Sequence, residues 1–131
     1  YATWVARQHV GSPLIDGGGV PGPVTPEDSA AAAADSVELR GRAAFIAAGC
    51  LGCHAMVGTP TAGLTALQGP NLSHFGSRLR LAAGVLDNTD ENLARWLRTP
   101  EDVKSGSLMK LPRPLTQDEV TALVAYLRAH Q

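Results

Sequence analysis

Two cysteines and a histidine stand together in the run Cys50-Leu51-Gly52-Cys53-His54. In a helical turn, positions i, i+3 and i+4 project from one face, so the two thiols and the imidazole point the same way. Two thiols on one face can add to the two vinyl groups of a haem, and the imidazole can then bind the iron. The pattern C-x-x-C-H therefore predicts covalent attachment of one c-type haem, with His54 as an iron ligand.

The same spacing of two cysteines also occurs in redox dithiols and in zinc sites. A thioredoxin-like dithiol normally lies near a β-α-β unit, whereas the residues before Cys50 repeat apolar side chains at helical intervals. A zinc site usually needs a second pair of ligands, and the sequence has no further Cys-x-x-Cys or His-x3-His pair. We therefore expect haem attachment, with a redox dithiol and a chance occurrence of the pattern as the alternatives.

The face of the haem opposite His54 needs a ligand, a water or a substrate, and the chain offers two methionines. Met56 lies two residues after His54, so it emerges on the same side of the haem. Met109 lies far enough along the chain to reach the other side, in a loop punctuated by glycine and proline. From composition alone, an ordinary core methionine is an equally good interpretation of Met109. The remaining histidines are His9, His74 and His130, of which only His74 can compete as a ligand.

Length and composition limit the chain to one domain and a tail. Of the 131 residues, 44% are hydrophobic but only 5% are aromatic, so a flat prosthetic group would add apolar surface to the core. The formal net charge of −1 gives no reason to expect a nucleic-acid partner or an anionic membrane surface. No run of about 18 apolar residues occurs, so we expect no segment that spans a bilayer.

The chain is expected to have two parts. Residues 11–35 are rich in glycine, proline and alanine without periodicity, which predicts a flexible linker. Within it, the alanines at 30–34 are able to begin a frayed helix. Residues 1–35 together are expected to be this linker and the tail of a preceding domain, and residues 36–131 a mono-haem domain. The chain begins at Tyr1 without a signal peptide, which indicates a processed or excised fragment.

Three helices are expected after residue 35, each opened by a side chain that can accept hydrogen bonds from first-turn N–H groups. They are a first helix to about residue 50 capped by Asp35 or Ser36, a second from Thr89 to Pro100, and a terminal helix opened by the capping box of Thr116 and Glu119. Residues 55–85 are expected to be loop with one short helix. These signals predict a small all-α domain.

Residues 36–131 resemble class I cytochromes c. The matching elements are Gly41 and Phe45, the haem motif, Gly69-Pro70-Asn71-Leu72, the run from Leu93 to Pro100, Met109, and Tyr126 on the last helix. Residues 69–78, 82–89 and 91–93 are similar, more specifically, to the cytochrome c domain fused to subunit II of caa-type haem-copper oxidases. The resemblance implies a class I cytochrome c fold of three to five helices around one covalent haem, after an irregular N-terminal tail.

The resemblance also implies roles for individual residues. Met109 is then the iron ligand opposite His54, and the backbone carbonyl of Pro70 accepts a hydrogen bond from the His54 ring. Three further residues are implied to contact the haem: Phe45 by packing, and Arg78 and Trp96 by hydrogen bonds to its propionates. The alternatives are a turn proline for Pro70, a core phenylalanine for Phe45, a solvated arginine for Arg78 and a packing tryptophan for Trp96. Gly41 and Tyr126 are implied to lie where the first and last helices cross.

The chain departs from the family pattern in two places. The family often has a proline directly after the ligand methionine, whereas Lys110 and Leu111 here precede Pro112. The cysteine-rich copper motif that precedes the haem domain in subunit II of these oxidases is absent from the 131 residues.

Histidine and methionine ligands leave no open position on the iron, which predicts one-electron transfer and no catalysis by this domain alone. The resemblance implies transfer from an electron-donor protein, another cytochrome or a small redox protein, to the copper-containing domain of the same subunit of a membrane-anchored, oxygen-reducing oxidase. The apolar residues Leu51, Ala55, Met56 and Val57 are expected to form a small docking patch at the haem edge.

Attachment at C-x-x-C-H normally takes place outside the cytoplasm, so we expect the periplasm or the extracytoplasmic face of the cytoplasmic membrane. The alternatives for function are a free-standing soluble electron carrier, and a haem sensor or peroxidase-like enzyme from which Met109 dissociates.

Overall fold

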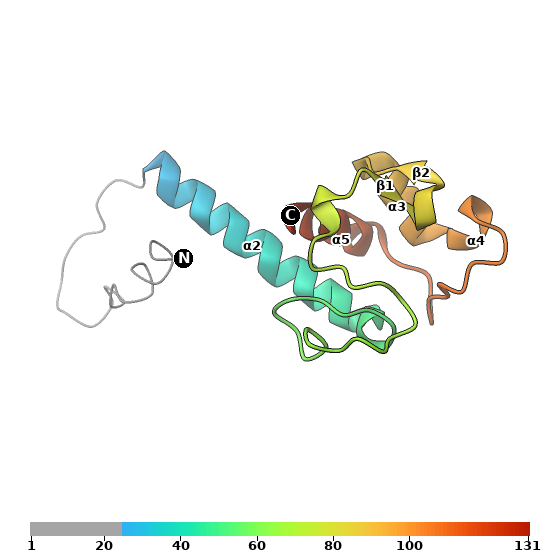
Figure 1. Ribbon diagram of the computed structural model, residues 1–131. Coiled ribbons are helices and arrows are strands. Elements are labelled where there is room, and N and C mark those ends of the chain that lie inside the picture. The colour runs from blue at the N-terminus through green and yellow to red at the C-terminus, as the bar shows by residue number, and fades with distance from the viewer. Residues whose placement is uncertain (1–24) are drawn as a thin grey trace.

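The structure is a computed structural model that describes residues 25–131. Predictions on residues 1–24, which include His9 and most of the expected linker, lie outside the described residues. The α-helices are α2 (Pro26–Ala47), α3 (Asp90–Arg98), α4 (Pro100–Val103) and α5 (Gln117–Ala129). Between them lie the 3-10 turns η1 (Cys50–Gly52), η2 (Phe75–Ser77) and η3 (Ala82–Gly84), and the strands β1 (Arg80–Leu81) and β2 (Leu86–Asp87). The domain is mainly helical, as predicted (Figure 1).

The core is built on the crossing of α2 and α5. A Cβ atom added at Gly41 would lie 2.1 Å from Cβ of Tyr126, so only glycine allows the two helices to approach this closely. Phe45, one turn further along α2, packs on the Tyr126 ring with centroids 6.0 Å apart. Both aromatic side chains are fully buried. The predicted meeting of Gly41 and Tyr126 is therefore present in the structure.

Helix α2 begins earlier than the sequence predicted, at Pro26 instead of near residue 35. Thr25 precedes a proline in the first helical position, and its carbonyl accepts a hydrogen bond from Ser29 N at 3.1 Å. Residues 30–34 are alanines, which have the highest helix propensity, so the helix continues without a break. The end of the expected flexible linker is thus helical, and this exposed first half of α2 projects from the domain (Figure 1).

The other end of α2 also differs from the expectation, because the helix stops at Ala47 and not at the haem motif. Gly49 adopts a left-handed conformation with φ of 78°, which ends the helix at low cost for a residue without a side chain. The cysteines then lie on the tighter turn η1 and just after it. This turn sets the relative orientation of the two cysteine side chains. It is held by the Cys50 carbonyl, which accepts hydrogen bonds from Cys53 N and His54 N.

Helices α3 and α5 begin where the sequence predicted. The Thr89 hydroxyl accepts from Asn92 N at 3.2 Å. Thr116 and Glu119 form the capping box. The Thr116 hydroxyl accepts a hydrogen bond from Glu119 N at 3.2 Å, and the Glu119 carboxylate accepts one from Thr116 N at 2.9 Å. Pro100 does end α3, but it also opens the short helix α4, which was not predicted.

Residues 55–85 hold more structure than the expected loop with one short helix. They include η2 and η3, and β1 pairs with β2 in an antiparallel hairpin with Arg80 opposite Asp87. The two side chains also form an ion pair at 2.8 Å. This hairpin, together with α3, forms a wall facing the haem motif.

The capping box makes the stability of α5 depend on pH. Two hydrogen bonds from Arg113, at 2.6 Å and 2.9 Å, and the backbone N–H of Thr116 lower the pKa of Glu119 to about 2. Because an unfolded glutamate has a pKa of about 4.3, ionised Glu119 stabilises the fold at neutral pH, and this contribution is lost as the pH falls from about 4.5 to 2. We expect Glu119→Gln to lower the melting temperature at pH 7 and the difference from wild type to shrink at pH 3.

Glu91→Gln is the control, because Glu91 is also a first-turn glutamate, in α3, but it is exposed whereas Glu119 is half-buried. Thermal unfolding of the three proteins between pH 7 and pH 2.5 provides the test. A gap between wild type and Glu119→Gln that stays constant over this range would contradict the prediction.

Candidate functional site

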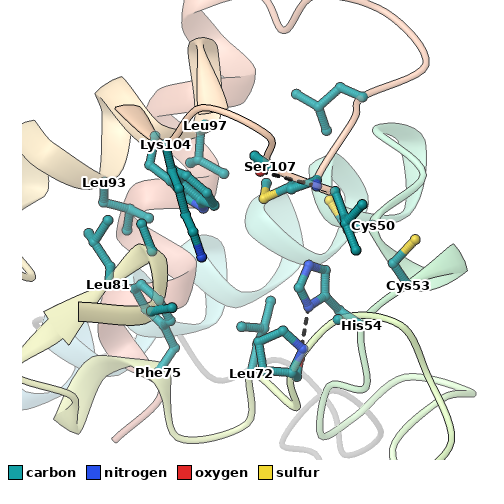
Figure 2. Close-up of a pocket in the computed structure, with 18 of the residues that line it drawn as sticks. Cys50, Cys53, His54, Leu72, Phe75, Leu81, Leu93, Leu97, Lys104 and Ser107 are labelled. Atoms are coloured by element: carbon teal, nitrogen blue, oxygen red, sulfur yellow. Dashed lines mark hydrogen bonds between the residues drawn. The ribbon is translucent and has the colours of Figure 1, made fainter. Parts of the chain in front are cut away.

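A cavity of about 660 Å³ lies between the haem motif, the β1–β2 hairpin, α3 and the loop that follows α4. Its volume is within the range of roughly 300–1,000 Å³ that is usual for ligand sites. Figure 2 shows Phe75, Leu81 and Leu93 on one side of the cavity and Cys50, Cys53 and His54 on the other. Buried apolar side chains make up much of its wall: Leu72, Phe75, Leu81, Leu93, Leu97 and Leu127.

The cavity brings together most of the residues that the sequence singled out. Those in its lining are Cys50, Cys53, His54, Pro70, Arg78, Trp96 and Met109. Phe45 is different, because it packs on Tyr126 in the core between α2 and α5 and is not part of the cavity lining. The structure gives Phe45 a core position, and the aromatic residues of the lining are Phe75 and Trp96.

The His54 imidazole is held by the segment that follows the 57–68 loop. Its Nδ1 lies 2.8 Å from the carbonyl oxygen of Pro70. A carbonyl only accepts, so Nδ1 carries the proton, and in the neutral imidazole Nε2 keeps a lone pair for a metal ion. The backbone supports this contact, because Gly69 N donates to Cys53 O at 2.7 Å and Leu72 N to Ala55 O at 2.9 Å.

Gly69 contributes more than the sequence analysis assigned to it. A Cβ atom at this position would lie 2.4 Å from Cε1 and 2.6 Å from Nδ1 of His54. The segment can therefore pass along the imidazole only because residue 69 has no side chain. The glycine directly before Pro70 was the only local signal for this close approach. A glycine does not by itself indicate which side chain packs against the backbone there.

Both cysteines line the cavity, Cys50 half-buried and Cys53 exposed. Burial raises the pKa of Cys50 to about 11, since apolar surroundings disfavour a thiolate. A Cys50 thiol that stays protonated at neutral pH is a poor nucleophile for disulfide exchange. Within residues 25–131, no three side chains of His, Cys, Asp or Glu are grouped as metal ligands, so a zinc site lacks its donor set.

Met109 is half-buried and lines the cavity, in the loop after α4. Met56 is fully buried in the core and does not line it. His74 lies outside the cavity lining, with Nδ1 3.1 Å from Gln131 O, and His130 is also outside, with Nδ1 2.8 Å from Tyr126 O. Among the described methionines and histidines, only Met109 and His54 line the cavity.

The charged side chains of the lining are all cationic. They include Arg78, Arg80, Lys104 and Lys110, and no carboxylate side chain. The Arg78 guanidinium donates to Asn71 O and lies 5.7 Å from the centroid of the Phe75 ring. An apolar cavity with cations at its edge fits a flat apolar group that carries carboxylates. Arg80 and the two lysines were not predicted from the sequence, because a charged residue in a loop is usually solvated.

The expected docking patch is not present as predicted. Ala55 and Met56 are 2% and 0% exposed, so they belong to the core. The hydrogen bond from Leu72 N to Ala55 O ties this part of the chain inward. Of the four apolar residues, Val57 is exposed and Leu51 is half-buried.

Residues 39–131 match the cytochrome c family model. The chain belongs to the cytochrome c family. It is 41% identical over 95 residues to "Cytochrome c oxidase subunit 2" of Alkalihalophilus pseudofirmus (strain ATCC BAA-2126 / JCM 17055 / OF4), a match that covers 72% of this chain. Proteins of the same name from Bacillus sp. (strain PS3) and Bacillus subtilis (strain 168) are 39% and 36% identical, over 71% and 68% of this chain.

These matches cover 26%, 26% and 25% of the three relatives, so the chain spans about a quarter of their length. Membership of the family implies a haem c cofactor and haem-based electron transfer. The cavity fits this cofactor, because two residues that can bind iron line the same space as the two cysteines. They are His54, through its imidazole, and Met109, through its thioether. Within residues 25–131, no helix is long and apolar enough to cross a membrane.

Proposed function

We propose that this cytochrome c is the haem-bearing part of subunit 2 of a cytochrome c oxidase, and that it passes single electrons to the copper-containing domain of that subunit. The donor is an electron-donor protein, either another cytochrome or a small redox protein. One observation carries the proposal: a single cavity is lined by both thiols, His54 and Met109. The names of the three similar proteins support the assignment to subunit 2.

In this proposal, Cys50 and Cys53 hold one haem through thioether bonds, and His54 Nε2 and Met109 Sδ bind its iron. The bound haem supplies a one-electron couple between ferrous and ferric iron. The carbonyl of Pro70 keeps His54 Nδ1 protonated and makes the imidazole a stronger donor. The Met109 thioether is a soft ligand that favours the ferrous state and raises the midpoint potential.

The remaining lining residues hold and shield the cofactor. Buried leucines exclude water, which further favours the less charged ferrous site. Arg78 and Trp96 donate hydrogen bonds to the propionates, because a partly buried carboxylate needs paired donors. With His54 and Met109 both bound to it, the iron would have no place for a substrate, and this domain would exchange electrons alone.

We place this domain in the periplasm or on the extracytoplasmic face of the cytoplasmic membrane, where C-x-x-C-H motifs receive their haem. The parent subunit is membrane-anchored in this proposal. A reading frame that encodes a copper-binding domain before Tyr1 is expected. A parent frame without one would instead make the protein a free-standing electron carrier.

Optical spectroscopy of the haem-loaded protein tests the ligand set. We expect the ferric protein to show a methionine-to-iron charge-transfer band and the ferrous protein to bind no carbon monoxide at neutral pH. Ready binding of carbon monoxide would contradict electron transfer as the sole role, and would support a sensor or peroxidase-like enzyme with a dissociable Met109.

A further inference from the structure

The loop that carries Met109 is shaped by a buried serine two residues earlier. Ser107 is 6% exposed and lines the cavity. Its Oγ accepts a hydrogen bond from Met109 N at 3.2 Å, and its own N–H donates to Lys104 O at 3.1 Å. Gly106 between them has φ of 77°, which suits the tight turn. Ser107 therefore joins the turn after α4 to the backbone of Met109 (Figure 2).

Side chains in this loop border the cavity but differ in exposure. Leu108 is 74% exposed and Lys110 is exposed, whereas Met109 between them is half-buried. The orientation of the peptide group before Met109 influences how deeply the Met109 side chain reaches into the cavity. The bond from Met109 N to Ser107 Oγ fixes that peptide group. This hydrogen bond is present in the conformation in which Met109 lines the cavity.

Other restraints on the loop are weak by comparison. No proline directly follows Met109, so the backbone there is not stiffened from that side. Lys110 pairs with Glu101 at 3.8 Å, but both side chains are mostly exposed, and such ion pairs contribute little. A buried hydroxyl that accepts a backbone N–H is the stronger restraint.

We propose that Ser107 is a positioning residue that keeps the Met109 thioether on the iron. This inference rests on the proposed function, in which Met109 is the second axial ligand. Loss of the hydroxyl would leave Met109 N without its acceptor, and loop conformations with the thioether away from the iron would become more populated. An external ligand would then compete for the iron more successfully, because it binds only those conformations.

Titration of the haem-loaded ferric protein with imidazole, followed through the methionine-to-iron band, measures this competition. In Ser107→Ala, we expect the apparent Kd for imidazole to fall about fivefold, the effect of one ordinary hydrogen bond. Ser107→Thr keeps a hydroxyl and is expected to retain the wild-type Kd. Ser105→Ala is the matched control, because Ser105 is an exposed serine of the same loop and is expected to leave the Kd unchanged.

Equal Kd values in Ser107→Ala and Ser105→Ala would overturn the inference, even if Ser107→Ala unfolded at lower urea concentration. A Ser107→Thr protein that behaved like Ser107→Ala would overturn the role of the hydroxyl as acceptor. These results would leave the proposed function intact. Absence of the methionine band in the wild-type protein is a different result, since it would overturn Met109 as ligand and this inference with it.

Discussion

Replacement of Met109 by alanine is expected to abolish the methionine-to-iron band and to lower the midpoint potential. The thioether stabilises ferrous iron, and water or a harder ligand in its place favours the ferric state. A decrease on the order of 0.1 V or more is expected, since axial ligands tune haem potentials over roughly 0.8 V. Ferrous Met109→Ala should also bind carbon monoxide at neutral pH. Optical titration against redox mediators provides both measurements.

The second methionine of the chain gives a matched control. Met56 is fully buried in the core and outside the cavity lining. Met56→Ala should therefore keep the band and the potential, but lower the free energy of unfolding by about 2–5 kcal/mol through the cavity that it leaves. Retention of both the band and the potential in Met109→Ala would place the second axial ligand elsewhere.

Local signals in the sequence predicted the helices that begin with side-chain caps. Thr89 bonds to the N–H of a residue three positions later, and Thr116 and Glu119 bond to one another's backbone. Each interaction involves residues within one helical turn, so its partners can be identified without knowledge of the fold. For the same reason, Cys50, Cys53 and His54 could be grouped from spacing alone.

The start of α2 at Pro26 was not predicted, because the glycine- and proline-rich composition of the preceding residues was given more weight than the helix-start residues at 25–28. Thr25, Pro26 and the following acidic residues form a typical helix start, but they lie at the end of a stretch rich in glycine and proline. The early start makes the segment directly before the haem domain stiffer than predicted. A helix keeps a fixed distance of about 1.5 Å per residue between its ends, whereas the ends of a flexible linker have no fixed separation.

The β1–β2 hairpin could not be predicted from a pattern, since strands of two residues are too short to show alternation. Its turn uses Ala82 and Ala83 with φ of 52° and 57°, a conformation that non-glycine residues seldom adopt. Arg80 holds the turn through Nη2, 2.8 Å from Gly84 O, and through Nη1, 2.8 Å from Asp87. The conformation therefore depends on a side-chain clamp that spans several residues.

The site as a whole required contacts between residues far apart in the chain. The distance of 2.8 Å between His54 and Pro70 and the close approach of Gly41 to Tyr126 have no local signature. Resemblance to a family indicated these pairs, and spacing alone did not. Position on α2 was likewise insufficient for Phe45, because one face of that helix packs on α5, away from the cavity.

Replacement of Gly69 by alanine is expected to change the potential in the opposite direction from Met109→Ala. The added Cβ would lie 2.4 Å from Cε1 of His54 and 2.8 Å from the carbonyl oxygen of Cys53, so the segment must move away. Pro70 O would then lose its 2.8 Å contact with Nδ1. A less strongly hydrogen-bonded imidazole is a weaker donor to ferric iron, so the midpoint potential should rise.

Unfolding separates this effect on the iron ligand from general damage to the fold. Gly69→Ala should lower the free energy of unfolding in urea by about 1–3 kcal/mol, as overpacking usually does. Gly63→Ala is the matched control: no atom lies within 4 Å of its added Cβ, so neither quantity should change. A Gly69→Ala protein that lost stability with an unchanged potential would show that His54 keeps its hydrogen bond to Pro70. In that case the backbone around Cys53 would absorb the added methyl group, and Gly69 would serve packing alone.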